Sequence, residues 1–260
     1  MPTRSSYPEG VPCWVDLSAA DPSAAKTFYT RLLGWEFEDM PNPGGGIYSM
    51  ARLHGHYVGA VGGQPPGTPE DTPSHWNTYL AADDVTAVTA RVAGAGGQVL
   101  MGPDDVGESG RMAFVADPTG AVVGLWEAGQ HIGATLEKET GTLVWSELIT
   151  PDPAAALAFY RDVIGMTHTE APMPDGTYTL LHAGGEDIGG CTTPRMPQVP
   201  THWHVYFATD DADASAEIAT TAGGSVMAEP FDVPGAGRIA VIADPTGGVF
   251  SVIRPDPAQQ

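Results

Sequence analysis

Apolar and polar residues alternate along residues 14–19, with Trp14 and Asp16 on one face and apolar residues on the other. This two-residue period predicts a β-strand with one face against a core. After an Asp-Pro pair, apolar residues recur at helical spacing as far as Gly34. Asp suits an N-cap, Pro the first helical position and Gly a left-handed C-cap, so a helix is predicted there.

The same succession of patterns occurs four times along the chain. Each predicted helix is followed by three short strand candidates separated by Gly and Pro turns; the first three lie near residues 35–39, 47–53 and 57–62. Later helices are expected after Asp84, Asp152 and Asp210. The sequence therefore predicts an α+β fold of four βαβββ modules, each of about 60 residues.

The second half of the chain repeats the first. Trp14 and Asp16 recur as Trp145 and Glu147, 131 positions later, and an Asp-Pro-Thr-Gly run recurs at an offset of 127. Repetition at a fixed period indicates an architecture of duplicated units. We expect a first domain at residues 10–128, a linker at residues 129–140 and a second domain at residues 141–256.

The formal charge of −21 at pH 7 argues against nucleic acid or an anionic membrane as a partner, because both are bound by positive surfaces. No apolar run reaches the length of a membrane span. The two cysteines, Cys13 and Cys191, are not at equivalent positions of the repeat and make no disulfide framework. We expect a cytoplasmic protein, monomer or homodimer, whose partner is a small molecule.

The chain resembles the vicinal oxygen chelate superfamily, the group of glyoxalase I, bleomycin-resistance proteins and extradiol dioxygenases. The resemblance rests on the tandem modules, on the strand, Asp-Pro and Phe-Tyr helix that open each half, and on Asp-Pro-Thr-Gly near each end; it covers residues 11–255. It implies that two modules form one curved sheet around a cleft, so that one chain has two clefts.

The resemblance also implies four metal-ligand positions in each half, and this sequence departs from most of them. In the two halves these positions hold Trp14 and Trp145, Asn77 and His204, Gly124 and Ser251, and the acid-free residues 58–60 and 188–190. A catalytic divalent metal normally has about three protein ligands. Only His204 is a strong ligand at its expected place, so we expect no metal at the family's position.

A relocated divalent metal is a second hypothesis. His202, His204 and Glu147 could meet on one strand face, and two His with one carboxylate form a known open iron site. Such a metal would support lyase, isomerase or dioxygenase chemistry. In the other interpretation, His202 satisfies a backbone group where its strand begins.

Aromatic residues stand where ligands would be expected. Trp14 and Trp145 offer flat apolar walls to a planar guest, or they fill the cleft themselves. Tyr79 and Tyr206 lie two residues beyond Asn77 and His204, on the same strand faces. They could stack on a ligand or donate hydrogen bonds to it, or they are ordinary strand aromatics.

The carboxylates Asp16 and Glu147 are the candidate catalytic groups. A carboxylate within an apolar strand costs free energy unless it has partners, and in an apolar cleft it can act as a general base. Arg111 and Arg238, which each follow a Gly at equivalent positions, could instead form ion pairs with these acids. Contact with ligand and plain exposure are the remaining possibilities.

We therefore expect a metal-independent protein that binds a small apolar or aromatic molecule, for natural-product resistance or biosynthesis. One alternative is an enzyme that uses a relocated metal or the base Asp16 or Glu147. The other is a non-catalytic scaffold whose clefts are filled by its own side chains.

Overall fold

The structure is a computed structural model that describes residues 3–41, 45–173 and 176–256. The first half follows the predicted order of strand, helix and three strands, twice over. Its elements are β1 (Pro12–Ala19), α1 (Pro22–Leu33), β2 (Glu36–Pro41), β3 (Ile47–Leu53), β4 (His56–Gly63), β5 (His75–Ala81), α2 (Val85–Val92), β6 (Gln98–Asp105), β7 (Gly110–Ala116) and β8 (Val122–Ala128).

The second half repeats this order. Its elements are β9 (Leu143–Ile149), α3 (Pro153–Ile164), β10 (Thr167–Met173), β11 (Gly176–Ala183), β12 (Glu186–Thr192), β13 (His202–Ala208), α4 (Ala212–Thr221), β14 (Ser225–Val233), β15 (Gly237–Ala243) and β16 (Val249–Pro255). The predicted α+β fold of four βαβββ modules is confirmed.

Each half forms its own eight-stranded mixed sheet, so the two modules of one half share a sheet. The strand orders are β2-β3-β4-β1-β5-β8-β7-β6 and β10-β11-β12-β9-β13-β16-β15-β14. At the centre of each sheet the two modules meet through an antiparallel pair, β1 with β5 and β9 with β13. Neither sheet closes into a barrel, because the outermost strands of each order do not pair.

The helix starts follow the predicted chemistry. The Asp21 carboxylate accepts hydrogen bonds from the amides of Ser23 (3.0 Å) and Ala24 (3.1 Å), and α1 ends at Gly34 with φ 73°. Asp84, Asp152 and Asp211 cap the other three helices in the same way. These capping bonds satisfy amides that have no partner inside the helix.

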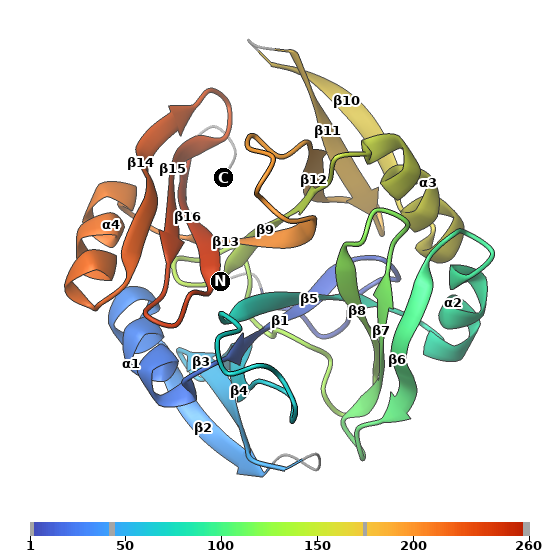
Figure 1. The fold of residues 1–260 in the computed structure, drawn as a ribbon, viewed down its shortest axis with the longest axis horizontal. Helices are drawn as coiled ribbons and strands as arrows, with labels where there is room; N and C mark the ends of the chain where they lie inside the picture. Colours follow the sequence, from blue (N-terminus) through green and yellow to red (C-terminus); the bar gives the residue numbers. More distant parts are fainter. Residues whose placement is uncertain (1–2, 42–44, 174–175, 257–260) are drawn as a thin grey trace.

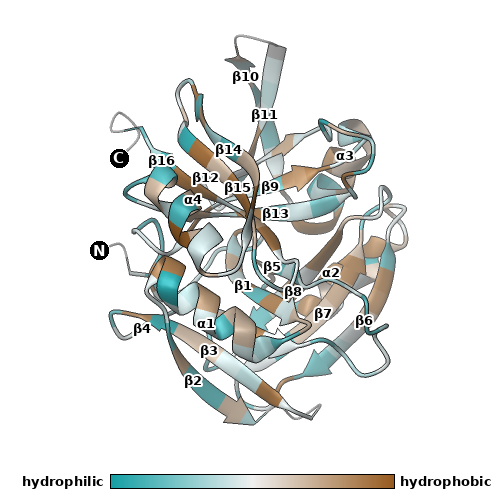
Figure 2. Cartoon of the chain, turned by 60° about the vertical axis from the view of Figure 1, so that its left-hand side comes forward, coloured by the Kyte–Doolittle hydropathy of each residue, from teal (hydrophilic) through white to brown (hydrophobic). Residues whose placement is uncertain are grey.

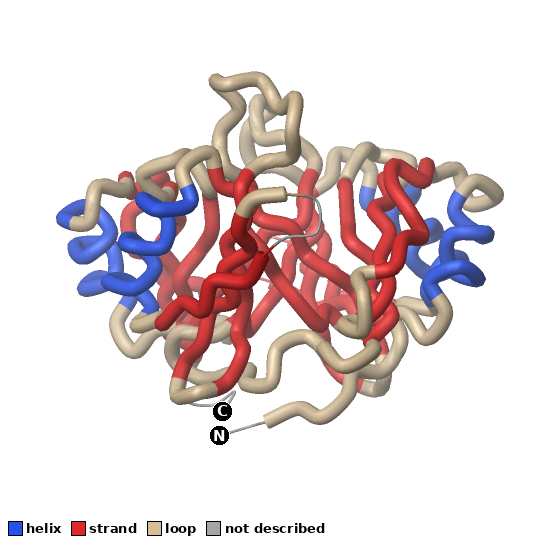
Figure 3. Tube along the Cα trace, turned by 90° about the horizontal axis from the view of Figure 1, so that it is seen from below, coloured by secondary structure: helices blue, strands red, loops and turns tan. Residues whose placement is uncertain are grey.

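The two halves lie back to back and share their cores. Helix α1 packs beside α4 at one flank and α2 beside α3 at the other, as Figure 1 shows. Figure 3 shows the helices on the two outer sides with the strands between them. One core cluster joins Phe28 of α1 to Phe250 of the second sheet, and another joins Val88 of α2 to Phe159 of α3. These two clusters, which include the helices, are therefore built from both halves, whereas a third, smaller cluster lies on the opposite face of the first sheet.

Strand alternation divides each sheet into two faces. Val15 and Leu17 of β1 lie in the core with α1, whereas Trp14 and Asp16 point to the opposite face, which we call the inner face. The helices are amphipathic, and Figure 2 shows hydrophobic and hydrophilic residues interleaved along α1 and α4. The inner faces carry the candidate carboxylates and aromatic residues of the site.

The repeated Asp-Pro-Thr-Gly runs are turns that also join the halves. One oxygen of Asp244 accepts from the amide of Thr246 (2.7 Å), its hydroxyl (2.8 Å) and the amide of Gly248 (3.0 Å). The other oxygen accepts the hydroxyl of Tyr29, which comes from α1 of the first half (2.9 Å). Turn geometry and the contact between halves thus depend on the same carboxylate.

Candidate functional site

Asp16 is the centre of a hydrogen-bond cluster on the inner face of the first sheet. One of its oxygens accepts the hydroxyls of Tyr48 (2.8 Å) and Tyr79 (2.9 Å), and the other accepts the amide of Asn77 (2.8 Å). Only 6% of Asp16 is exposed. Burial raises the pKa of its carboxyl, and the three hydrogen bonds act in the opposite direction. The buried carboxylate has the partners that its burial requires.

The same cluster includes the indole of Trp14, whose Nε1 donates to the Tyr48 hydroxyl (2.9 Å). An indole, a phenol and a carboxylate therefore follow one another across β1 and β3. Tyr48 was missed from the sequence. It recurs as Tyr178 at an offset of 130, between the two main offsets of the repeat, and that shared position was the available signal.

The second sheet has the same series of hydrogen bonds around Glu147. The hydroxyl of Tyr178 donates to one Glu147 oxygen (2.6 Å) and that of Tyr206 to the other (2.9 Å). Trp145 Nε1 donates to the Tyr178 hydroxyl (3.1 Å). Each Glu147 oxygen thus has one phenol donor and keeps further acceptor capacity.

His204 occupies the position of Asn77, but it does not donate to Glu147. Its Nε2 lies 2.8 Å from Ser251 Oγ, and its Nδ1 lies 3.4 Å from His202 Nε2. His202 Nδ1 in turn lies 2.8 Å from the Pro200 carbonyl, which confirms that His202 satisfies a backbone group where its strand begins. Burial, and then the nearby His202, lower the pKa of His204 to about 3. Burial also lowers the pKa of His202. The two imidazoles thus form a hydrogen-bond chain from Ser251 to the Pro200 carbonyl.

The structure does not bring the candidates for a relocated metal, His202, His204 and Glu147, together as a ligand set. Among the residues that the structure describes, no three His, Cys, Asp or Glu side chains gather as ligands would. His202 and His204 bond to each other and to Pro200 and Ser251, so they do not converge with Glu147 on one point. The relocated site therefore lacks its expected geometry.

Tyrosine rings take the room that two of the family's ligand side chains would need. The ring of Tyr79 lies directly over Gly124, and the hydroxyl of Tyr178 lies over Gly190. A Cβ atom at either glycine would overlap the tyrosine. The tyrosine rings thus occupy the space that is free because the ligand side chains are missing.

The proposed ion pairs between the acids and arginines are wrong. Arg111 pairs with Asp105 (2.9 Å) and Glu127 (3.6 Å), and Arg238 pairs with Asp213 (2.5 Å) and Asp232 (3.2 Å). The physical reason is alternation: Arg111 shares its strand face with the core residues Ala113 and Val115, on the helix side. Both arginines lie on the face opposite to the carboxylates.

The chain between the two sheets covers part of the first inner face. His131 lies edge-on to Trp14 (ring centroids 4.6 Å apart), with Trp126 and Tyr57 at 5.7 and 6.0 Å. The backbone amide of Ala134 donates to the Cys13 carbonyl (2.8 Å), which fixes this segment to β1. Burial lowers the pKa of His131 to about 4. The His131 imidazole therefore fills the space among the aromatic rings on the first inner face.

The two inner faces differ in access. Trp14 and Tyr79 are 5% and 6% exposed. In the second half, Trp145, Glu147, Tyr178 and Tyr206 are all half-buried. Solvent therefore reaches the second cluster more readily than the first.

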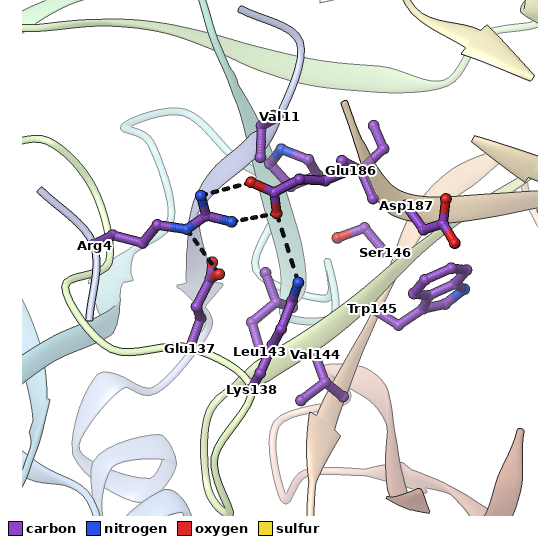
Figure 4. A pocket seen from close by; sticks show the side chains of 12 residues that line it. Arg4, Val11, Glu137, Lys138, Leu143, Val144, Trp145, Ser146, Glu186 and Asp187 are labelled. Atoms are coloured by element: carbon purple, nitrogen blue, oxygen red, sulfur yellow. Dashed lines mark hydrogen bonds and ion pairs between the residues drawn. The ribbon is translucent and has the colours of Figure 1, made fainter. Parts of the chain in front are cut away.

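A separate small cavity of about 40 Å³ lies where residues 4–12, the chain between the sheets and β12 meet. Figure 4 shows Arg4 between Glu137 and Glu186, with Lys138 on Glu186 as well; the Trp145 side chain points away from these ion pairs. Its size suits a water molecule, and its ion pairs attach the N-terminal segment to the second half.

The chain belongs to the glyoxalase/bleomycin resistance protein/dioxygenase superfamily, whose family model matches residues 13–125 and 142–252. This confirms the resemblance seen in the sequence. The two matched segments correspond to the two sheets.

Among its relatives, the chain is 57% identical over 261 residues, the full length of both, to "Putative glyoxylase CFP32" of Mycobacterium tuberculosis. It is 37% identical over 259 residues to the anthracycline biosynthesis protein DnrV of Streptomyces peucetius, covering 95% of this chain and 94% of that one.

Solved structures share the fold at low identity. A Mn(II)-bound glyoxalase from Novosphingobium aromaticivorans matches with a TM-score of 0.63 and 17% identity, over 95% of this chain and 83% of that chain. The 2,3-dioxygenase LapB from Pseudomonas sp. KL28 matches with a TM-score of 0.66 and 14% identity, over 98% and 97%. No helix among the described residues has the length and apolar character needed to cross a membrane.

Proposed function

We propose that this protein binds a small aromatic or apolar molecule, without a metal, on the inner face of its second sheet. The observation that carries the proposal is the half-buried cluster of Trp145, Tyr178, Glu147 and Tyr206. It stands where the superfamily resemblance implies metal ligands. The first sheet has the same chemistry but is closed by its own side chains and by His131.

The cluster suits a flat molecule that carries a hydroxyl group. Indole and phenol rings provide large apolar contact area with few rotatable bonds. The free acceptor capacity of Glu147 can take a hydrogen bond from a ligand hydroxyl, and a bond to a charged acceptor is among the stronger ones. Recognition would thus combine ring contact with one directional polar contact.

The names of the relatives support a role in natural-product chemistry. A protein of anthracycline biosynthesis is 37% identical over nearly the whole chain. We therefore place the ligand among aromatic natural products or their precursors, with sequestration or biosynthesis as the role. The cytoplasm stays the expected compartment; both cysteines, Cys13 and Cys191, are buried and free.

Calorimetric titration with 2-naphthol tests the proposal, and tryptophan fluorescence gives a second readout. We expect 2-naphthol to bind, and Glu147→Gln to weaken binding about tenfold because a charged acceptor is lost. Asp16→Asn is the matched control in the first half and should change the Kd less than twofold. Equal loss in both variants would place the site elsewhere, and no binding by the wild type would refute the proposal.

A second candidate function is proton abstraction by Glu147, which is favoured by its half-buried place on the inner face, where the carboxylate is held in one orientation by two phenols and keeps acceptor capacity for a substrate proton. In heavy water, the protein should then accelerate deuterium exchange at the acidic carbon of 2-tetralone, followed by NMR. Glu147→Gln should abolish the acceleration while 2-naphthol still binds measurably. Exchange that persists in Glu147→Gln would exclude this carboxylate as the base.

A further inference from the structure

Arg195 stands out among the basic residues. The chain has eleven Lys and Arg residues against a formal charge of −21. Eight of them form ion pairs among the described residues, all but Arg31, Arg195 and Arg254. Arg195 is exposed, and it has no ion pair within residues 3–41, 45–173 and 176–256. An unpaired cation in so acidic a protein is available to an anion from outside.

The position of Arg195 relates it to the second inner face. It lies on the loop between β12 and β13, drawn in orange in Figure 1, and its guanidinium carbon is 5.9 Å from the centroid of the Phe231 ring. Phe231 of β14 pairs with Ile239, and Ile239 with Ile253 of β16. By alternation these residues share the face of Ser251, the partner of His204. The loop therefore holds the cation beside the inner face.

The charge of Arg195 also acts on the candidate site itself. Burial, and then Glu147, raise the pKa of Tyr206 well above its usual range, and the positive charge of Arg195 acts on that hydroxyl in the opposite direction. The same hydroxyl donates to Glu147. The same surroundings thus hold an acceptor at Glu147 and a cation at Arg195. A ligand that fits both needs a donor group at one end and an anionic oxygen at the other.

The first half has no counterpart of this residue. The equivalent loop, residues 64–74, contains Glu70 and Asp71 and no Lys or Arg. Arg195 therefore distinguishes the second inner face from the first, in addition to the greater exposure of the second face.

We propose that Arg195 is a specificity-determining residue that selects planar aromatic ligands bearing an acidic oxygen, a carboxylate or a phenolate. This inference rests on the proposed function and names the ligand class for the same site. A guanidinium binds a carboxylate with two parallel hydrogen bonds, gives a charge-assisted hydrogen bond to a phenolate oxygen, and stacks on an aromatic ring. Pro194, Pro197 and Pro200 restrict the loop backbone, which reduces the entropy lost when the side chain is ordered.

Two matched probes test the inference, 6-hydroxy-2-naphthoate and 6-hydroxy-2-naphthamide, which differ in the charge at one end. For the wild type we expect the carboxylate to bind about tenfold more tightly than the amide at low salt, and this preference to shrink as salt is added. Arg195→Gln should remove the preference and leave the Kd of the amide within twofold. Arg31→Gln, on α1, makes the same change in net charge and should keep the preference.

The outcomes distinguish a failure of the role of Arg195 from a failure of the proposed binding function. If both probes bind the wild type equally, or if Arg195→Gln keeps the preference, Arg195 does not select the ligand. The proposed function then still stands, provided that the amide binds and Glu147→Gln weakens it. If neither probe binds, the proposed function fails and the inference fails with it.

Discussion

At the scale of single residues, the two halves differ in how they provide hydrogen-bond donors to the carboxylate on the inner face. A carboxylate on an inner strand face needs donors. Asp16 is short and nearly buried, and it accepts from two phenols and the Asn77 amide. Glu147 is one methylene longer and half-buried, and it accepts from two phenols, one on each oxygen.

The phenol donors should therefore differ in their effect on stability. Tyr79→Phe removes a donor from a buried carboxylate and should lower the free energy of unfolding by about 2 kcal/mol. Tyr206→Phe acts on a half-exposed group, so a loss of about 1 kcal/mol or less is expected. Urea unfolding measures both. A larger loss in Tyr206→Phe would contradict the difference in burial.

His204 should make stability depend on pH. Its pKa is about 3 in the folded protein against an ordinary 6.5, so the unfolded chain takes up a proton that the folded one refuses. Its contribution is present above pH 6.5 and is lost as pH falls toward 3, by up to about 1.4 kcal/mol per pH unit.

The variant that checks this is His204→Asn, the residue that the first half has at Asn77. Urea midpoints at pH 7, 6 and 5 should fall more steeply for the wild type than for the variant. Comparing the two cancels the titration of Asp16 and of the other acids. A difference that is the same at all three pH values would mean that His204 does not titrate in this way.

At the scale of elements, the chain between the sheets acts as a cover for the first inner face. His131→Ala should expose Trp14, because the imidazole edge lies against that indole. Acrylamide quenching of tryptophan fluorescence should rise in the variant. The rise should disappear in the double variant with Trp14→Phe; if it persists there, another tryptophan has become exposed.

Element prediction succeeded where local chemistry decides the outcome. Asp-Pro starts, Gly ends and alternating strands depend on nearby residues, and the duplicated sequence repeated each signal. The sequence did not predict which modules share a sheet. Pairing between modules is a long-range contact, and the repeated sequence makes the possible pairings look alike. The structure shows β1 paired with β5 and β9 with β13.

Among the candidate site residues, the strand face could be predicted for those on a short alternating strand. Trp14 and Asp16 were placed correctly on one face. The predicted ion pairs with arginine were wrong because opposite charge alone does not bring two side chains together. Arg111 lies on the strand face of Ala113 and Val115, away from the carboxylates. Tyr48 was missed because it comes from a different strand, and contact across β1, β4 and β3 is not visible in spacing along the chain.

At the scale of the whole molecule, the two core clusters that include the helices are each shared between the halves. Phe28 packs with Phe250, and Tyr29 donates to Asp244, each across the boundary between halves. We expect residues 10–128 expressed alone to expose apolar surface and to lack a cooperative unfolding transition, whereas the full chain unfolds in one step. Circular dichroism during urea unfolding measures both. A cooperative transition in the isolated half would show that the shared cores are not required.

The unequal access to the two inner faces has a consequence for how such a chain can change over generations. In a symmetric dimer of half-length subunits, every substitution appears in both sites at once. Here a substitution enters one copy only, so equivalent positions can hold Asn77 beside a buried carboxylate in one half and His204 beside a half-buried carboxylate in the other. Joining the copies end to end lets the two inner faces differ in chemistry, while both copies go on contributing to the shared cores.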